Sequence, residues 1–318
     1  IALAKKTAKP VKLEYTREEQ FIATESRHPF IQIGKIGVKR DGTITALQMK
    51  LIANAGAYFS QSGSVTAASV GKFCSLYRCP NVAAEADIVY TNTPVSGGLR
   101  GYGTPQAVFA LEQLVDMACE KIGIDRIEFR LKNHRRSGDE SLVPSIPIES
   151  CALDECIKVG AERIGWKGKQ AKKGKGASKR GIGMAIAMHD TGVYPVLLEH
   201  SEAFIKVNED GSANLIVSVC DMGQGIFGVL AQIAAEELGL LAKDVHIVSG
   251  DTDVTMFDVG QHASRSCYAV GNAVKGAANE AKRQLLQRAA KTLKVSPDEL
   301  EAKNKRIYVR ATPRKGIT

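Results

Sequence analysis

The chain of 318 residues lacks any long apolar run. Its longest apolar stretches, such as residues 215–220 (LIVSVC), are far shorter than the roughly 20 residues of a membrane-spanning helix. Hydrophobic residues make up 44% and charged residues 24%, which excludes a disordered chain and is typical of globular proteins. The chain also lacks an initiator methionine and a signal-peptide pattern. We therefore expect a fragment or processed subunit of a cytoplasmic protein.

Patterns of protein-bound metal and of common nucleophiles are missing too. The tightest cysteine spacings, Cys74-x4-Cys79 and Cys151-x4-Cys156, do not match the CxxC pairs of structural zinc sites. No HxxxH, HExxH or GxSxG motif occurs. The seven cysteines are an odd number in a long chain, and nothing requires disulfides. This composition favours free thiols in a reducing compartment and argues against catalysis by protein-ligated zinc.

Acidic residues are absent from one strongly basic segment. Between Arg163 and Arg180 there are eight basic residues and no acidic one, and removing these eight charges from the net charge of +9 leaves +1. The Lys/Gly-rich part, residues 166–180, is typical of a solvated loop. Binding of nucleic acid or another polyanion through residues 163–180 is the alternative, although no aromatic residue lies among these lysines, as single-strand binding would favour.

Hairpin signals and long helical repeats occur on both sides of this segment. Asp-Gly pairs in residues 40–43 and 209–211 predict two tight turns between strand-like runs. Strands are expected at residues 11–15, 31–38, 46–53, 203–207, 214–219 and 245–248, and helices at 105–118, 229–238 and 268–293. Hairpins combined with long helices predict an α+β fold of mixed sheets.

Three polar or glycine-rich turns each precede a helix. They are residues 96–105 (SGGLRGYGTP), 221–225 (DMGQG) and 261–266 (QHASRS). A turn that enters a helix exposes backbone N–H groups beside the positive end of the helix dipole, which suits phosphate, carboxylate or oxo groups. The three turns could converge on one anionic ligand. Alternatively, the glycines only permit tight turns and the serines only cap helices.

Seven segments together resemble the molybdenum-binding large subunit of the xanthine dehydrogenase and aldehyde oxidase family of molybdenum hydroxylases. They occur in family order between residues 10 and 274. They are PVKL with TREE, RHP, NAGAY, GGLRGYGTPQ, MGQGI with LAQIAAEELG, GDTD and HASRSCYAVGNAV. The number of segments in register makes the resemblance specific.

The resemblance implies two molybdopterin-binding domains, both partial. The first would cover residues 1–147 without its N-terminal end, and the second residues 148–318 without its C-terminal end and with the 166–180 loop. The implied cofactor is molybdopterin with molybdenum, in the cytosine dinucleotide form. The implied partners are [2Fe–2S] and FAD modules, the remaining part of the molybdenum subunit and a small-molecule substrate, without nucleic acid or a membrane span.

The resemblance also assigns roles to the residues of the three turns. The Arg100 amide would lie near an oxygen ligand of molybdenum, and Gln224 would donate a hydrogen bond to the apical oxo group. Leu99 and Tyr102 would contact substrate. The cofactor-binding set is Arg100, Gly101, Met222, Gly223, Gln224, Gly225, Ala263, Ser264 and Ser266. No protein side chain would ligate molybdenum, because the pterin dithiolene binds it.

The family hydroxylates an electron-poor C–H carbon of an N-heteroaromatic compound or an aldehyde with oxygen derived from water. Its glutamate base belongs to a GVGEPP-like motif, which these 318 residues do not contain. We therefore expect no catalytic residue in this chain and no turnover by the chain alone. Gly101 replaces the cysteine of members that oxidise carbon monoxide, and Ala68 replaces the arginine of members that oxidise xanthine.

A third interpretation is a relic that retains the fold without the cofactor. Retention of Arg100, Gln224, Ser264 and Ser266 on three separate turns disfavours a relic, because the fold alone does not require these polar groups. The sequence therefore favours the cofactor-binding portion of a redox enzyme.

Overall fold

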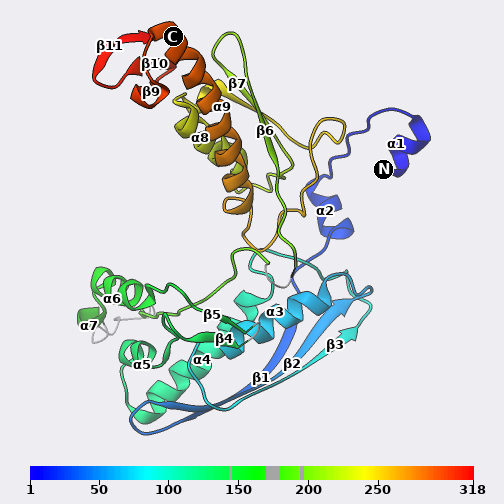
Figure 1. Cartoon of the computed structure of the whole chain (residues 1–318). Coiled ribbons are helices and arrows are strands. Elements are labelled where there is room, and N and C mark those ends of the chain that lie inside the picture. Colours follow the sequence, from blue (N-terminus) through cyan, green and yellow to red (C-terminus); the bar gives the residue numbers. More distant parts are fainter. Residues whose placement is uncertain (143–144, 170–179, 194–196) are drawn as a thin grey trace. The chain divides into compact units, whose positions relative to one another are not determined.

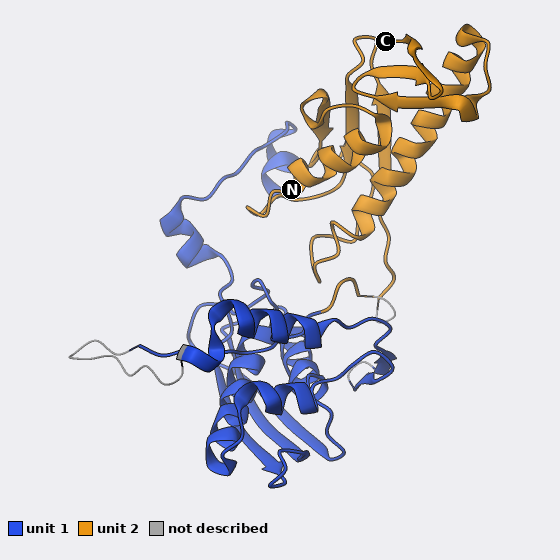
Figure 2. Ribbon diagram, turned by 90° about the vertical axis from the view of Figure 1, so that its left-hand side faces the viewer, with its two compact units in different colours: residues 1–189 blue, residues 190–318 orange. Residues whose placement is uncertain are grey.

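The computed structural model describes residues 1–142, 145–169, 180–193 and 197–318. These residues form two compact units, residues 1–189 and 190–318, which are coloured separately in Figure 2. Each unit has its own hydrophobic core. The fold is therefore described one unit at a time.

Unit 1 is built on a three-stranded sheet in the order β1-β2-β3, with α3 and α4 against one face (Figure 1). The hairpin β1–β2 is antiparallel, whereas β3 runs parallel to β2 after a crossover through α3. Alternate residues of β2, such as Leu47, Met49 and Leu51, are buried against the helices. The bounds are β1 (Phe30–Val38), β2 (Ile44–Gly56), α3 (Ser62–Ser75), β3 (Val82–Tyr90) and α4 (Thr104–Ile122).

The remaining elements of unit 1 are short helices and one small hairpin. They are α1 (Ala2–Thr7), α2 (Arg17–Ala23), α5 (Arg126–Asn133), β4 (Glu140–Leu142), β5 (Ser145–Pro147), α6 (Leu153–Ile164) and α7 (Trp166–Lys169). Ile157 of α6 and Ile186 belong to the same core as β2 and α4. Compact unit 1 therefore continues beyond residue 147, the end predicted for the first domain.

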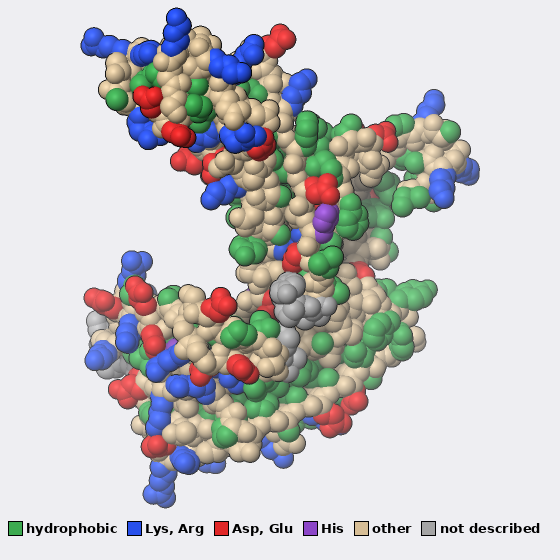
Figure 3. Space-filling view, in the orientation of Figure 1, with side chains coloured by type: hydrophobic (Ala, Val, Ile, Leu, Met, Phe, Trp, Pro, Cys, Tyr) green, Lys and Arg blue, Asp and Glu red, His purple; other side chains and the backbone are tan. Residues whose placement is uncertain are grey.

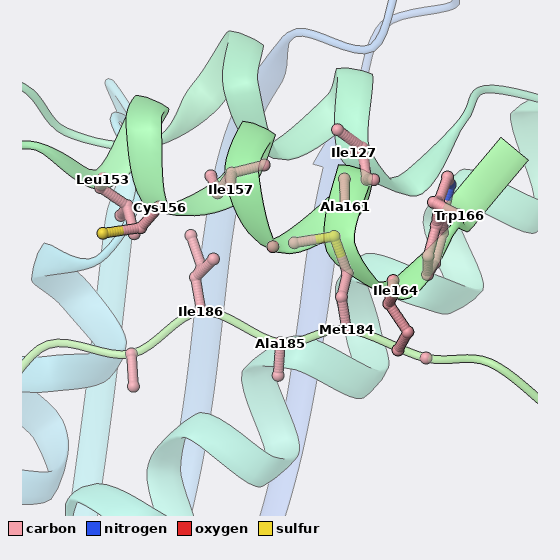
Figure 4. A pocket seen from close by; sticks show the side chains of 13 residues that line it. Ile127, Leu153, Cys156, Ile157, Ala161, Ile164, Trp166, Met184, Ala185 and Ile186 are labelled. Carbon is pink, nitrogen blue, oxygen red and sulfur yellow. The ribbon is translucent and has the colours of Figure 1, made fainter.

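An apolar pocket of about 330 Å³ lies between α6 and the extended segment 183–187 (Figure 4). Side chains such as Ile157, Ile186 and Met184 line it from the two sides. The lining includes the Cys156 thiol but no charged side chain. The pocket therefore lacks the convergent polar groups that chemistry on a substrate requires.

Unit 2 repeats the same order of elements. An antiparallel hairpin β6–β7 is followed by a crossover through α8 to β8, which is parallel to β7, and then by α9. A small antiparallel sheet β9–β10–β11 packs on the second half of α9. The bounds are β6 (Ala203–Val207), β7 (Ala213–Val217), α8 (Ile226–Leu238), η1 (Ala242–Asp244), β8 (Val245–Val248), α9 (Ala269–Leu293), η2 (Pro297–Glu299), β9 (Leu300–Lys303), β10 (Arg306–Val309) and β11 (Thr312–Ile317).

Both units thus share a β-β-α-β-α order. A turn in one unit therefore corresponds to the turn at the same position of this order in the other unit. The 96–105 turn precedes α4, the fifth element of this shared order, whereas the 221–225 turn precedes α8, the third element of the order. The counterpart of the 96–105 turn is therefore the loop 249–268 before α9. The counterpart of the 221–225 turn is the loop 57–61 before α3.

The α+β prediction is confirmed, with both predicted hairpins and all three long helices present. The strand predicted at residues 11–15 is wrong, because this segment is exposed coil without a partner strand. The two parallel strand pairs were not predicted. Strand β3 is mostly exposed and contains Ala83, Ala84 and Ala86, so it lacks the apolar run that is typical of a buried parallel strand.

Basic residues also concentrate in a second segment, besides residues 163–180. From Lys282 to Lys315 there are eleven basic and three acidic residues. They lie along the end of α9 and on β9–β11, where Figure 3 shows many Lys and Arg side chains. Of the predicted 166–180 loop, residues 166–169 form α7 and residues 170–179 lie outside the described residues. In the described part of the chain, no helix is long and apolar enough to span a membrane.

Candidate functional site

The turn before α4 presents two backbone N–H groups in a fixed direction. The carbonyl of Leu99 accepts a hydrogen bond from the Tyr102 N–H at 2.7 Å. The carbonyl of Arg100 accepts one from Nη2 of Arg27, also at 2.7 Å. Because a trans peptide directs its C=O and N–H to opposite sides, the N–H groups of Arg100 and Gly101 point away from these partners. Both are thus available to an acceptor outside the turn.

Arg27 and Gln106 support this turn from two elements. Arg27 also donates to Oε1 of Gln106 at 3.2 Å, and the Gln106 amide donates to the His28 carbonyl at 3.2 Å. These contacts join the segment before β1 to the first turn of α4. The direction of the Arg100 carbonyl therefore depends on a side chain 73 residues away in sequence.

Three successive residues of this turn have left-handed backbones. The φ angles of Gly101, Tyr102 and Gly103 are 90°, 46° and 89°. A non-glycine residue at positive φ is strained, and such strain is concentrated at functional sites. Outside helix ends and the 304–305 hairpin turn, the described non-glycine residues with positive φ are Ser60, Tyr102, Ala263 and Ser264. Three of these four belong to the predicted site.

Replacing Gly103 by alanine should destabilise unit 1 more than replacing Gly123 by alanine. Both glycines have positive φ, but a Cβ on Gly103 would lie 2.4 Å from the Val65 carbonyl oxygen, whereas one on Gly123 meets nothing within 4 Å. We expect a loss of about 1 kcal/mol for Gly123→Ala and about twice that or more for Gly103→Ala. Urea denaturation measures both, and equal losses would contradict the steric argument.

In unit 2, the turn 221–225 is organised by Asp221. Its Oδ1 accepts the N–H groups of Gly223 at 2.8 Å and Gly225 at 3.2 Å. The side chain of Gln224 folds onto the same turn, accepting from the Met222 N–H at 2.6 Å and donating to the Cys220 carbonyl at 2.9 Å. Since a carboxamide nitrogen carries two protons, one remains for a ligand. The turn itself is exposed.

The loop 261–266 contains two adjacent left-handed residues. Ala263 and Ser264 have φ angles of 46° and 52°, and neither is a glycine. The Ala263 carbonyl accepts the Gly192 N–H at 2.8 Å, and the buried Ser266 hydroxyl donates to Gln261 at 2.6 Å. Ser264 itself is exposed. The loop therefore exposes Ser264 to solvent. Its left-handed backbone is unfavourable by itself, so contacts of neighbouring residues must stabilise it.

The next residue of the loop, Arg265, is anchored by many contacts. Its side chain is fully buried between the carboxylates of Glu199 and Asp258. Its other acceptors are the carbonyls of Gly260 and His200 and the hydroxyl of Ser201. Burial raises the pKa of Glu199, but hydrogen bonds from Arg265 and the Val193 N–H outweigh it, so the pKa is below its ordinary value. Arg265 thus joins the loop 258–266 to residues 199–201.

The two turns of unit 2 lie at the same end of the unit. A Cβ on Gly271 would lie 3.1 Å from Cδ1 of Ile233, and Nδ2 of Asn279 lies 3.5 Å from Oε2 of Glu237. Because contacting residue numbers rise together, α8 and α9 are parallel and begin at the same end. The N–H groups of the first turn of α8 have no intrahelical acceptor. Unit 2 therefore gathers backbone donors, the Gln224 amide and the Ser264 hydroxyl at one end.

These donor sets suit a bound anionic or oxo-bearing cofactor. Among the described residues, no group of three His, Cys, Asp or Glu side chains could bind a metal ion. The turns offer neutral N–H and O–H donors, which bind oxygen ligands and phosphates. The turns therefore have the donor chemistry of a site for a cofactor that carries oxygen groups.

Comparison with known families identifies this class. The profile of a molybdopterin cofactor-binding domain matches residues 1–134, and a second profile with the same description matches residues 159–318. The xanthine dehydrogenase molybdenum-binding subunit of Escherichia coli O157:H7 is 38% identical over 284 residues. The match covers 88% of this chain and 38% of that subunit. The chain belongs to the xanthine dehydrogenase and aldehyde oxidase family of molybdenum-dependent oxidoreductases.

Solved structures agree with this assignment. Quinoline 2-oxidoreductase from Pseudomonas putida 86 superposes with a TM-score of 0.84 at 23% identity, over 99% of this chain and 42% of that one. Aldehyde oxidoreductase from Desulfovibrio gigas gives a TM-score of 0.74 at 27% identity, over 87% and 31%. The chain thus spans between 31% and 42% of the length of these three relatives. It corresponds to part of a molybdenum-binding large subunit.

Sequence reasoning identified the turns but missed the side chains that support them. In sequence, Arg27 belongs to the RHP segment and Arg265 to the HASRS segment, and neither position by itself indicates a supporting role. No local pattern reveals that Arg265 is buried, because its acceptors lie 64 to 66 residues away as well as nearby. The only available signal was an arginine flanked by serines in a loop expected to bind a ligand.

Proposed function

We propose that this chain forms the cofactor-binding part of an enzyme that hydroxylates an electron-poor C–H carbon of an N-heteroaromatic compound or an aldehyde, using oxygen from water. The left-handed residues Tyr102, Ala263 and Ser264 on the predicted turns carry this proposal. Relatives named xanthine dehydrogenase, aldehyde oxidoreductase and quinoline 2-oxidoreductase support this reaction class. Bound molybdopterin would supply the molybdenum centre that accepts two electrons from substrate.

The residues of this chain would bind and orient that cofactor. In unit 1, the N–H groups of Arg100 and Gly101 would donate to an oxygen ligand of molybdenum. In unit 2, Gln224 would donate to the oxo group. The pterin would lie against Met222, Gly223 and Gly225, whose own N–H groups donate within the turn. Its donors would be the backbone N–H groups of Ala263, Ser264 and Ser266 and the exposed Ser264 hydroxyl. Neutral donors suit this role because they stabilise negative charge that develops on oxygens when the metal is reduced.

The other components of the enzyme are part of the same proposal. The pterin would carry a cytosine dinucleotide, and electrons would leave through [2Fe–2S] and FAD modules on partner chains or domains in the cytoplasm. The glutamate base would come from the part of the molybdenum subunit outside these 318 residues. This chain alone would therefore bind cofactor groups without completing a turnover.

Two positions restrict the class of substrate that this site would accept. Gly101 argues against carbon monoxide, because a cysteine would be needed there. Ala68 lies on α3 in place of an arginine, which argues against a purine bound through that arginine. Leu99 and Tyr102 are the side chains expected to contact an apolar or aromatic substrate.

The cofactor role can be tested in the complete molybdenum subunit. Gln224→Ala should lower molybdenum and pterin content several-fold, because the removed amide both donates to the cofactor and organises the 221–225 turn. Gln287→Ala, at an exposed position of α9, is the matched control and should leave the content unchanged. Metal analysis and pterin fluorescence give both values. Full cofactor content in Gln224→Ala would contradict the assignment of this turn.

A further inference from the structure

The carbonyl of Arg100 differs from its two neighbours in the turn 96–105. The carbonyls of Leu99 and Gly101 each accept the N–H of the residue three positions later, at 2.7 Å and 2.9 Å, and are thus bonded inside the turn. The Arg100 carbonyl lies between them in sequence and accepts from the side chain of Arg27 instead. Its direction therefore depends on a contact from outside the turn.

The backbone here has the pattern of a type II β-turn. Of its two central residues, Arg100 and Gly101, only Gly101 has a positive φ, at 90°. Reversal of the central peptide converts a type II turn into a type I turn, and a glycine at the third position permits it because glycine adopts either sign of φ. The peptide between Arg100 and Gly101 thus has two accessible orientations. Only one of them directs the Gly101 N–H out of the turn, away from Arg27.

Arg27 is held in place by its two neighbours in the chain. Ser26 forms a parallel bridge with Ser96, which lies just before the glycines of the turn. His28 is buried, and its Nε2 lies 2.8 Å from the Ser62 hydroxyl oxygen. With the chain fixed on both sides, the guanidinium reaches the carbonyl of the turn at 2.7 Å. This contact selects the orientation of the peptide in which its N–H points outward.

The charge of Arg27 acts on the same peptide. Among the residues that the structure describes, Arg27 forms no ion pair, and its second side-chain partner is the neutral amide oxygen of Gln106 at 3.2 Å. A cation bonded to a carbonyl oxygen polarises the peptide, because linked hydrogen bonds strengthen one another. The Gly101 N–H, on the other side of this peptide, is therefore a stronger donor. An ionised oxygen group gains most from it, since hydrogen bonds to charged groups are roughly twice as strong as neutral ones.

We propose that Arg27 is a positioning residue for the bound cofactor: its guanidinium holds the peptide between Arg100 and Gly101 so that the Gly101 N–H faces a cofactor oxygen, and its charge strengthens that donor. This inference rests on the proposed function, because the acceptor is the oxygen ligand assigned to that site. Arg27 occupies the carbonyl side of the peptide, so it acts through the peptide and not by contact with the cofactor. Its charge stabilises the reduced state of the metal, in which the oxygens carry more negative charge.

The test uses the complete molybdenum subunit with its partners and four variants. Arg27→Met removes the guanidinium and retains much of the side-chain volume, whereas Arg27→Lys retains the positive charge. Gln106→Glu leaves Arg27 in place but gives it a carboxylate in place of the amide at 3.2 Å. Arg40→Met, in the exposed turn between β1 and β2, is the matched control.

Two quantities are measured, and neither requires turnover or a known substrate. The first is the rate at which molybdenum is released from the folded protein, followed by metal analysis below the unfolding temperature of each variant. The second is the midpoint potential of the molybdenum centre, from a titration with sodium dithionite followed by electron paramagnetic resonance. Thermal unfolding of each variant shows that it is folded under these conditions.

We expect Arg27→Met to release molybdenum about tenfold faster than the wild type, the effect of losing one hydrogen bond to a charged group. Its midpoint potential should be more negative, because a positive charge no longer stabilises the reduced state. Gln106→Glu should shift the potential in the same direction, since its carboxylate neutralises Arg27. In both quantities Arg27→Lys should lie between Arg27→Met and the wild type, and Arg40→Met should match the wild type.

Release of molybdenum at the wild-type rate from Arg27→Met would overturn the positioning role. A wild-type potential in both Arg27→Met and Gln106→Glu would overturn the role of the charge. If Arg27→Met does not fold, Gln106→Glu decides alone, and a wild-type release rate and potential in that variant would overturn the whole inference. A wild-type subunit that contains no molybdenum would instead overturn the proposed function, so the two failures are distinguishable.

Discussion

Arg265→Met is expected to lower the free energy of unfolding of unit 2 by about 3–5 kcal/mol, since removing one partner of a buried ion pair leaves uncompensated charge. Here Glu199 and Asp258 would both lose the guanidinium that lies between them. Methionine retains much of the side-chain volume, so packing changes little. Chemical denaturation followed by circular dichroism measures the loss in the purified chain.

Arg265→Met should also change the conformation of the loop 261–266, in addition to lowering the free energy of unfolding. Arg265 stabilises the left-handed backbone of Ala263 and Ser264, so that backbone should relax when the arginine is removed. Cofactor content of the complete subunit would then fall even at temperatures where the variant is folded. Arg283→Met is the matched control, because Arg283 pairs with Glu280 on the exposed face of α9. Similar losses in both variants would show that burial of Arg265 is unimportant.

In unit 1 we expect the corresponding large effect from Arg130→Met. Arg130 of α5 is fully buried, and its guanidinium contacts Glu112 at 2.8 Å and Asp116 at 2.9 Å. The Glu112 carboxylate also accepts the Tyr77 phenol at 2.5 Å and the Ile186 N–H at 3.0 Å. Without the arginine, a buried carboxylate remains, and the expected loss is again about 3–5 kcal/mol.

This loss should be larger than that of a partly exposed arginine in the same unit. Arg78→Met is a suitable comparison, because Arg78 is 42% exposed and lies 3.8 Å from Asp139. A surface ion pair contributes roughly 0–1 kcal/mol. Urea denaturation of the two variants gives the difference. A second readout is limited proteolysis near residue 186, because Glu112 is the acceptor for the Ile186 N–H. Unchanged cleavage there would contradict the role of Glu112 in docking this segment.

The hairpins and long helices could be predicted because their signals are local. The Asp-Gly pair at residues 41 and 42 defines a tight turn, and the apolar spacing of Leu111 and Val115 defines a helix face. The parallel pairing of β2 with β3 depends on a crossover, and no residue of the exposed β3 indicates its partner. Local patterns therefore give the elements but not the parallel pairs.

For the candidate site, the turns could be predicted and their supports could not. Gly101, Gly103, Gly223 and Gly225 indicate turns by residue type alone, and the structure gives all four a positive φ. The left-handed backbone of Ala263 cannot be read from sequence, because alanine rarely adopts it. The residue two positions later, Arg265, is held by acceptors 64 to 66 residues away, which no local pattern indicates.

Ile186 completes the unit 1 core although it lies far along the chain from the other core residues, and this has a consequence for synthesis of the chain. The β1–β2 hairpin and the α3 crossover are local in sequence, and hairpins form within about 1–10 μs. Ile157 and Ile186 complete the same core but are made much later. At about 5–20 residues per second, several seconds separate Leu111 from Ile186 on the ribosome. During that interval the Glu112 carboxylate lacks the Ile186 N–H as a donor. The core of nascent unit 1 therefore stays incomplete until the extended segment around Ile186 has been synthesised.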